Sequence, residues 1–184
     1  MRILQAVPDG LLWLLAPGPV AERNLRRAMT ARGVDPDRLV IAPRRIEKED
    51  HLARLALADL ALDTRIYTGH VTTCDALWMG VPVITMRGEH FPGRVAASAL
   101  RAVGLAELVT GSLDDYCARA IRLAQSPPAR AAIRQQLMTT RGRVPLFDSA
   151  RYVRNLERTF RQIWRRACDG LAPVAIDVDE SDPT

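Results

Sequence analysis

The sequence predicts an α/β fold in which a parallel sheet is flanked by helices and is followed by a helical C-terminal region. Short apolar runs alternate with helix-like segments up to Gly111, and no further run of this kind follows it. Three of the runs show no clean polar alternation, which is typical of strands buried on both faces of a parallel sheet. The strand–helix alternation favours right-handed crossovers between parallel strands.

The expected strands are apolar runs bounded by turn-forming residues. They lie at 11–16, 39–42, 60–62, 81–86 and 105–109, and the runs at 11–16, 39–42 and 81–86 are those without alternation. Residues 1–8 resemble the end of a helix that leads into the first strand. We therefore expect that further chain precedes this domain.

The expected helices are segments in which apolar residues recur at helical spacing. They lie at 20–32, 47–58, 72–79, 91–103, 113–125, 128–140 and 149–168. Gly33, Gly80 and Gly104 directly follow such segments, as expected of glycines that end helices. We expect one domain over residues 1–170 and a disordered acidic tail over 171–184.

Length and composition narrow the class of protein. The 184 residues suit one domain of ordinary size, and 48% hydrophobic with 26% charged residues exclude wholesale disorder. No apolar run approaches the ~20 residues that span a bilayer, so we expect no membrane partner. The three cysteines are widely spaced and form no CxxC motif. This pattern predicts a reducing compartment, with the cytoplasm as the default, and no metal cage.

The net charge of +5 and the pI of about 9.7 raise the question of nucleic-acid binding. The basic residues are scattered, however, and the nine aromatic residues form no stacking stripe. We therefore expect no nucleic-acid partner. Lys48 is the one lysine among 26 basic residues, the others being arginines, and this makes it a candidate functional residue.

The segment 67–82 is the most informative candidate site. Gly69 permits close approach of a ligand to the backbone, and Thr72 and Thr73 add hydroxyls where a helix begins. A helix N-terminus binds phosphate through its free N–H groups and its dipole, and His70 adds a further donor. The alternative is structural: Thr72 is an N-cap residue and Asp75 its capping-box partner.

A second candidate site lies in the helix that follows residue 47. Lys48, His51 and Arg54 recur every three residues and so spread over one side of a helix. An ammonium, an imidazole and a guanidinium can together contact an anionic or planar ligand. The alternative is a solvated charged face with pairs such as Asp50–Arg54.

Other sequence features carry less information. His90 and Arg94 follow the run at 81–86 and are weaker candidates, and Cys74 is interpreted as a small helix residue rather than a nucleophile. The sequence contains no GxGxxG fingerprint, Walker loop, HExxH or GxSxG motif, and no metal-ligand cluster.

Taken together, these segments resemble the C-terminal catalytic lobe of the O-GlcNAc transferase and SPINDLY family. The resemblance covers roughly residues 3–168, with the matching stretches in the same order and at similar spacings. They are Val7-Pro8 with Leu12-Trp13-Leu14-Leu15, Lys48-Glu49-Asp50-His51, Leu57-Ala58-Asp59, Leu62-Asp63-Thr64, Gly69-His70-Val71-Thr72, Asp75-Ala76-Leu77-Trp78-Met79-Gly80-Val81-Pro82-Val83, Arg94-Val95-Ala96-Ala97-Ser98, Pro145-Leu146-Phe147-Asp148, Tyr152 and Leu156-Glu157.

The resemblance implies a GT-B glycosyltransferase whose C-terminal, Rossmann-like lobe holds the UDP of a UDP-sugar, with UDP-GlcNAc as the leading donor. These enzymes are inverting and metal-independent, so no cofactor or metal is expected. The resemblance assigns UDP contacts to seven residues: His51 on uracil, Arg54 at the base, Lys48 and Asp75 at the ribose, and His70 with Thr72 and Thr73 at the diphosphate.

The chain departs from the family at two points. Val71 stands where the family has a threonine, and the family's Gln…Lys pair and its acceptor-binding lobe, with the catalytic residues, lie upstream of this sequence. The expected function is therefore the donor-binding half of a protein O-glycosyltransferase, incomplete alone, with the N-terminal lobe and a protein acceptor as partners. The alternatives are a stand-alone, non-catalytic nucleotide-sugar-binding or regulatory module, and a basic nucleic-acid-binding protein.

Overall fold

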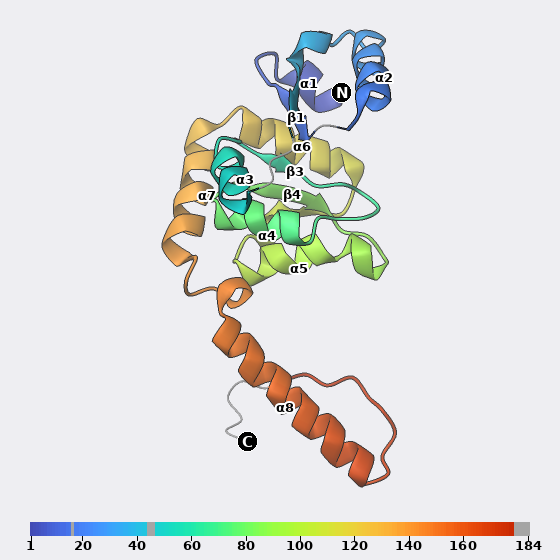
Figure 1. Ribbon diagram of the computed structural model, residues 1–184, viewed down its shortest axis with the longest axis vertical. Coiled ribbons are helices and arrows are strands. Elements are labelled where there is room, and N and C mark those ends of the chain that lie inside the picture. Colours follow the sequence, from blue (N-terminus) through green and yellow to red (C-terminus); the bar gives the residue numbers. More distant parts are fainter. Residues whose placement is uncertain (16, 44–46, 179–184) are drawn as a thin grey trace. The chain divides into compact units, whose positions relative to one another are not determined.

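The computed structural model describes residues 1–15, 17–43 and 47–178. The chain divides into two compact units, Met1–Thr140 and Arg141–Thr184. The first unit holds the strands and most of the helices, and Figure 1 shows helices α4 and α5 against the strands of this unit. The second unit is dominated by one long helix, α8.

The strands of the first unit are all parallel, as predicted, but they form two sheets within the described residues. β1 (Leu12–Leu15) pairs with β2 (Leu39–Ala42). β3 (Ala61–Leu62), β4 (Val83–Met86) and β5 (Val109–Thr110) form the second sheet in that order. Because the strands within each sheet are parallel, their carboxyl ends lie at the same edge of that sheet, where α/β proteins bind ligands.

The helices of this unit lie where the sequence predicts them, with bounds that shift by a few residues. They are α1 (Arg2–Ala6), α2 (Pro19–Thr30), α3 (Lys48–Leu55), α4 (Val71–Trp78), α5 (Val95–Ala102), α6 (Leu113–Ala124) and α7 (Pro127–Thr140). Short 3-10 turns, η1 (Pro36–Arg38), η2 (Phe91–Gly93) and η3 (Ala106–Leu108), complete the unit. The predicted helix over 91–103 divides into η2 and α5, because Pro92 and Gly93 interrupt regular helical geometry.

The strand predicted at 105–109 is wrong for most of its length. Residues 106–108 form η3, and β5 begins only at Val109. Gly104 ends α5 at φ 77°, and the Leu105 amide donates to Leu100 O, so the chain turns at once. Leu105 and Leu108 are buried through this turn, so their apolar character reflects core packing and not strand pairing.

The core of the first unit is centred on β4. Val83 and Ile84 are buried, and α5 packs against this strand with small residues such as Ala96 and Ala97. The prediction that run 11–16 is buried on both faces is wrong for β1, since Leu15 is 48% exposed. Its only strand partner among the described residues is β2, so no second strand pairs along its other edge.

The second unit contains η4 (Pro145–Phe147) and α8 (Ser149–Cys168), which has the predicted bounds. The Asp148 carboxylate caps α8 by accepting from the Arg151 amide at 2.8 Å. Residues 171–178 form no regular element, although Arg166 Nη2 donates to Ala172 O at 2.7 Å. Residues 179–184 lie outside the described part, so the predictions of a 1–170 domain and a disordered tail stay predictions. No helix among the described residues is long and apolar enough to cross a bilayer.

Candidate functional site

Helix α4 begins at the carboxyl edge of β3 without a side-chain cap. Its N-cap residue is His70, whose side chain makes no capping hydrogen bond, and Val71 is the first helical residue. The interpretation of Thr72 as an N-cap with Asp75 as its capping-box partner is therefore wrong. The N–H groups at such a helix start have no intrahelical acceptor, so this end of α4 can receive an anionic oxygen.

Gly69 packs closely against the first turn of α4. A Cβ atom on Gly69 would lie 2.5 Å from Thr73 Oγ1 and 2.7 Å from Thr72 Oγ1. Space, and not backbone conformation, therefore requires a glycine here, since its φ lies outside the left-handed region. Thr73 is 4% exposed, whereas Thr72 is exposed. Of the two predicted hydroxyls, that of Thr72 is the more accessible.

His70 is held between two aromatic rings at the start of α4. Its imidazole stacks on Tyr67 with ring centroids 5.1 Å apart and meets Phe91 edge-on at 6.1 Å. His70 Nε2 is buried and has no hydrogen-bond partner among the described residues. A buried polar atom without a partner is costly in a folded protein unless a ligand or water satisfies it.

The two candidate segments meet through one ion pair. Lys48 Nζ, at the first residue of α3, contacts Asp75 Oδ2 in α4. The Lys48 side chain is 52% exposed and that of Asp75 is 15% exposed. The structure thus brings together Lys48, Asp75 and the α4 start, which the sequence predicts as two separate sites.

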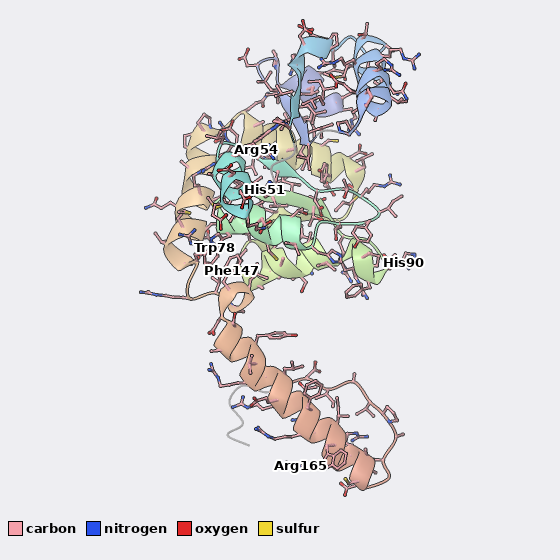
Figure 2. All side chains as sticks on the ribbon, in the orientation of Figure 1. His51, Arg54, Trp78, His90, Phe147 and Arg165 are labelled. Atoms are coloured by element: carbon pink, nitrogen blue, oxygen red, sulfur yellow. The ribbon has the colours of Figure 1, made fainter. Side chains whose placement is uncertain are left out.

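The remaining predicted residues of α3 lie further along the same helix. Figure 2 shows His51 and Arg54 on this helix, and both side chains are half-buried. Arg54 donates to Pro43 O, and its guanidinium lies 5.7 Å from the ring centroid of Trp13. These contacts, and not a pair with Asp50, fix the Arg54 side chain.

The weaker candidates do not join this group. His90 and Arg94 are exposed on either side of η2, and Figure 2 places His90 apart from His51. Cys74 is half-buried within α4, and burial, with a smaller contribution from the Asp75 carboxylate, raises the pKa of its thiol. A raised pKa disfavours the nucleophilic thiolate, which agrees with a structural role for Cys74.

Asp63 is a residue of this site that the sequence analysis did not single out. It lies directly after β3 and accepts hydrogen bonds from the Gly69 amide and the Thr85 hydroxyl. An acidic residue at the carboxyl end of a predicted parallel strand is the pattern that could have identified it.

Two open surface hollows lie away from these residues. One, of about 660 Å³, is lined by residues of α2 and η1, including Arg26 and Thr30. The other, of about 410 Å³, lies between α1 and α6. Neither is lined by a predicted UDP contact. Among the residues that the structure describes, no three His, Cys, Asp or Glu side chains gather as metal ligands would.

Comparisons with known proteins bear on the whole chain. The family described as Glycosyl transferase family 41 matches residues 1–156. The chain is 39% identical over 182 residues to the Arabidopsis thaliana protein named probable UDP-N-acetylglucosamine–peptide N-acetylglucosaminyltransferase SEC, covering 98% of this chain and 18% of that protein. It is 37% identical over 171 residues to the Caenorhabditis elegans UDP-N-acetylglucosamine–peptide N-acetylglucosaminyltransferase, covering 93% and 15%.

A comparison with solved structures finds a protein of the same kind. A mutant of the O-GlcNAc transferase from Thermobaculum terrenum matches with a TM-score of 0.86 and 37% identity, over 93% of this chain and 33% of that one. The chain thus spans about a fifth of the length of the curated relative from Arabidopsis thaliana. The match confirms the predicted α/β fold as that of a GT-B lobe, and the chain belongs to glycosyl transferase family 41.

Proposed function

We propose that this chain is the UDP-sugar-binding half of an inverting protein O-glycosyltransferase. The observation that carries the proposal is the start of α4, where an uncapped helix N-terminus meets a buried His70 Nε2 that has no partner. Such an arrangement suits phosphate, because the free N–H groups, the helix dipole and the imidazole all favour an anion.

The diphosphate would lie at the α4 start in this proposal. Its oxygens accept hydrogen bonds from the backbone amides of the first turn, from His70 and from the exposed Thr72 hydroxyl. The buried Thr73 side chain packs against Gly69. The proposal includes no metal ion, since fixed dipoles and donors at a preorganised site can stabilise the charge that a departing diphosphate gains.

The nucleoside would extend from the α4 start toward α3. The Asp75 carboxylate accepts hydrogen bonds from ribose hydroxyls, while Lys48, already paired with Asp75, donates to the same sugar. The half-buried His51 imidazole stacks on uracil, and Arg54 faces the base from one turn further along α3.

The transfer reaction would require more than this chain. GT-B enzymes react in a cleft between two lobes, and a cleft positions donor and acceptor only when both walls are present. We therefore assign the catalytic residues and the acceptor site to an N-terminal lobe, which would be the partner of this chain. The proposed acceptor is a protein. N-acetylglucosamine is the proposed sugar, because the relatives are named for its transfer. A cytoplasmic location is supported by three free cysteines.

Calorimetric titration of the purified chain with UDP tests this proposal, with GDP as the comparison nucleotide. We expect selective binding of UDP, and at least a tenfold loss of UDP affinity, on the order of 1.4 kcal/mol, in the double variant Lys48→Ala with His51→Ala. Glu49→Ala is the matched control, because Glu49 is an exposed residue of the same helix and has no assigned role.

Three results would overturn the proposal: no UDP binding at millimolar concentration, equal binding of GDP, or an unchanged affinity in the double variant. The stand-alone module would bind UDP-sugar in the same way but would not transfer sugar when an N-terminal family lobe is supplied. A nucleic-acid-binding protein would instead bind polynucleotide with an affinity that falls steeply with salt.

A further inference from the structure

The loop between β3 and α4 is closed at its base by one side chain. Asp63 Oδ1 accepts hydrogen bonds from the Thr64 amide at 2.9 Å and from the Gly69 amide at 2.7 Å. These bonds tie the beginning of the loop to its end. The residues between them include the exposed Ile66 and Tyr67, so the loop projects outward from a fixed base.

Asp63 is itself fixed by two neighbouring elements. Thr85 of β4, which is fully buried, donates through its hydroxyl to Asp63 Oδ2 at 2.6 Å. Tyr116 of α6 donates through its hydroxyl to the backbone carbonyl of Asp63 at 2.9 Å. Both carboxylate oxygens are therefore engaged inside the protein, and the side chain is half-buried. This network leaves Asp63 poorly placed to contact a ligand directly.

A second contact fixes the far side of the same loop. Thr68, which is fully buried, donates through its hydroxyl to Pro92 O at 2.5 Å and through its amide to the same oxygen at 2.9 Å. Gly69 follows directly and has no room for a side chain against α4. The position of the α4 N-terminus thus depends on where Asp63 holds the Gly69 amide.

The geometry points to Asp63 as a positioning residue for the diphosphate of the donor. This inference deepens the proposed function and rests on it. Asp63 acts through Gly69. Its carboxylate accepts a hydrogen bond from the Gly69 amide and thereby directs His70 and the first amides of α4 toward the ligand. The negative charge of Asp63 by itself disfavours a nearby diphosphate, so its benefit comes from geometry and not from its charge.

Substitutions at Asp63 separate geometry from charge. Asp63→Asn keeps an oxygen that accepts from the Gly69 amide and removes the negative charge, whereas Asp63→Ala removes both. We expect Asp63→Ala to bind UDP roughly tenfold more weakly or worse, since the Gly69 amide then loses its acceptor and the start of α4 is no longer held in place. We expect Asp63→Asn to bind UDP within about threefold of the unmodified chain.

UMP distinguishes positioning of the diphosphate from general loosening of the fold. Because UMP lacks the second phosphate, Asp63→Ala should lower the affinity for UMP by less than about threefold. The variant should therefore show a smaller preference for UDP over UMP. Thermal unfolding of each variant supplies the structural readout. Asp59→Ala is the matched control, because Asp59 precedes the same strand, carries the same charge and has a side chain that is 80% exposed.

The outcomes separate this inference from the proposed function. If the unmodified chain binds no UDP, the proposed function fails and the inference fails with it. If the unmodified chain binds UDP and Asp63→Ala binds it equally well, the inference alone is wrong. Equal losses of UDP and UMP, or a loss in Asp63→Asn as large as that in Asp63→Ala, also overturn it. Should Asp63→Ala not fold, Thr85→Val releases one carboxylate oxygen, and an unchanged preference for UDP over UMP then overturns the inference.

Discussion

Lys48 at the start of α3 donates to the carboxylate of Asp75 in the middle of α4, and this ion pair joins the two helices that carry the predicted UDP contacts. Asp75 is the more buried partner, and the positive charge of Lys48 balances the negative charge of its carboxylate. This is the site where ribose hydroxyls would bind. The one lysine of the chain thus has a structural role in addition to its proposed contact with the sugar.

A double-mutant cycle with Lys48→Met and Asp75→Asn measures the strength of this ion pair. Because Lys48 is about half exposed, we expect a coupling free energy of roughly 0.2–1 kcal/mol that falls with added salt. Urea unfolding of the four proteins provides the values. Additive effects of the two substitutions at low salt would show that the pair contributes nothing to stability.

Gly69→Ala should disturb the α4 start. The added Cβ would lie 2.5 Å from Thr73 Oγ1 and 2.7 Å from Thr72 Oγ1, so the threonine side chains, the loop or the first turn of the helix must shift. We expect a lower melting temperature and weaker UDP binding, measured by thermal unfolding and calorimetry. Gly111→Ala is the control, because a Cβ there meets nothing within 4 Å and φ is not positive. Equal behaviour of the two variants would contradict the close packing of Gly69.

Val71→Thr should strengthen UDP binding. Val71 is the first residue of α4, and its side chain is 67% exposed. A hydroxyl in this place adds a donor beside the amides that we assign to the diphosphate. One added hydrogen bond contributes about 0.5–1.5 kcal/mol, or roughly a twofold to tenfold gain in affinity. Calorimetry against UDP measures it, and Val71→Ala controls for the change in side-chain size. A Val71→Thr affinity no higher than that of Val71→Ala would place the diphosphate elsewhere.

The stability of the chain should fall at alkaline pH because of Tyr116. Burial, and secondarily the Asp63 charge, raises the pKa of its hydroxyl above the ordinary value of 10. Above about pH 10 the unfolded chain releases this proton while the folded chain retains it, so the free energy of unfolding decreases as the pH rises. Tyr116→Phe should be less stable at neutral pH and should lose less stability between about pH 9 and 11. Urea unfolding at several pH values measures both effects.

Tyr152→Phe provides the comparison for that experiment. Its side chain is 64% exposed, so it should leave the alkaline decrease unchanged. A Tyr116→Phe curve parallel to that of the unmodified chain would contradict the assignment.

The three cysteines should differ in reactivity. Cys168 is exposed at the end of α8, Cys117 is buried, and burial raises the pKa of the Cys74 thiol. Because the thiolate is the reactive form, we expect iodoacetamide to modify Cys168 first and Cys74 far more slowly. Mass spectrometry of peptides from the folded chain and the urea-unfolded chain measures this order. Early modification of Cys74 in the folded chain would contradict its half-buried position.

The sequence predicted the elements of this fold well, because apolar periodicity and helix-ending glycines are local features. It failed where apolar residues serve the core without forming a strand, as at Leu105 and Leu108. It also failed at β1, because exposure depends on which strands lie alongside and not on the run itself.

The site shows the same division between local and long-range information. Spacing placed Lys48 and Asp75 on separate helices correctly, but their contact joins residues 27 positions apart. Asp63 was missed because its role depends on Thr85 and Tyr116, which reach it from β4 and α6. Whether the seven predicted residues contact UDP stays a prediction.

The division of the strands into two sheets has a consequence for how the chain behaves in solution. Within the described residues, β1, β2, β3 and β5 each pair with one other strand, so each has an edge on which no further strand pairs. Unpaired strand edges are templates on which another strand can add. β3 and β5 are two residues long and offer little to pair with, whereas β1 and β2 have four residues each and carry the exposed Leu15 and Val40. Concentration-dependent association of the chain should therefore begin at the edges of the β1–β2 sheet.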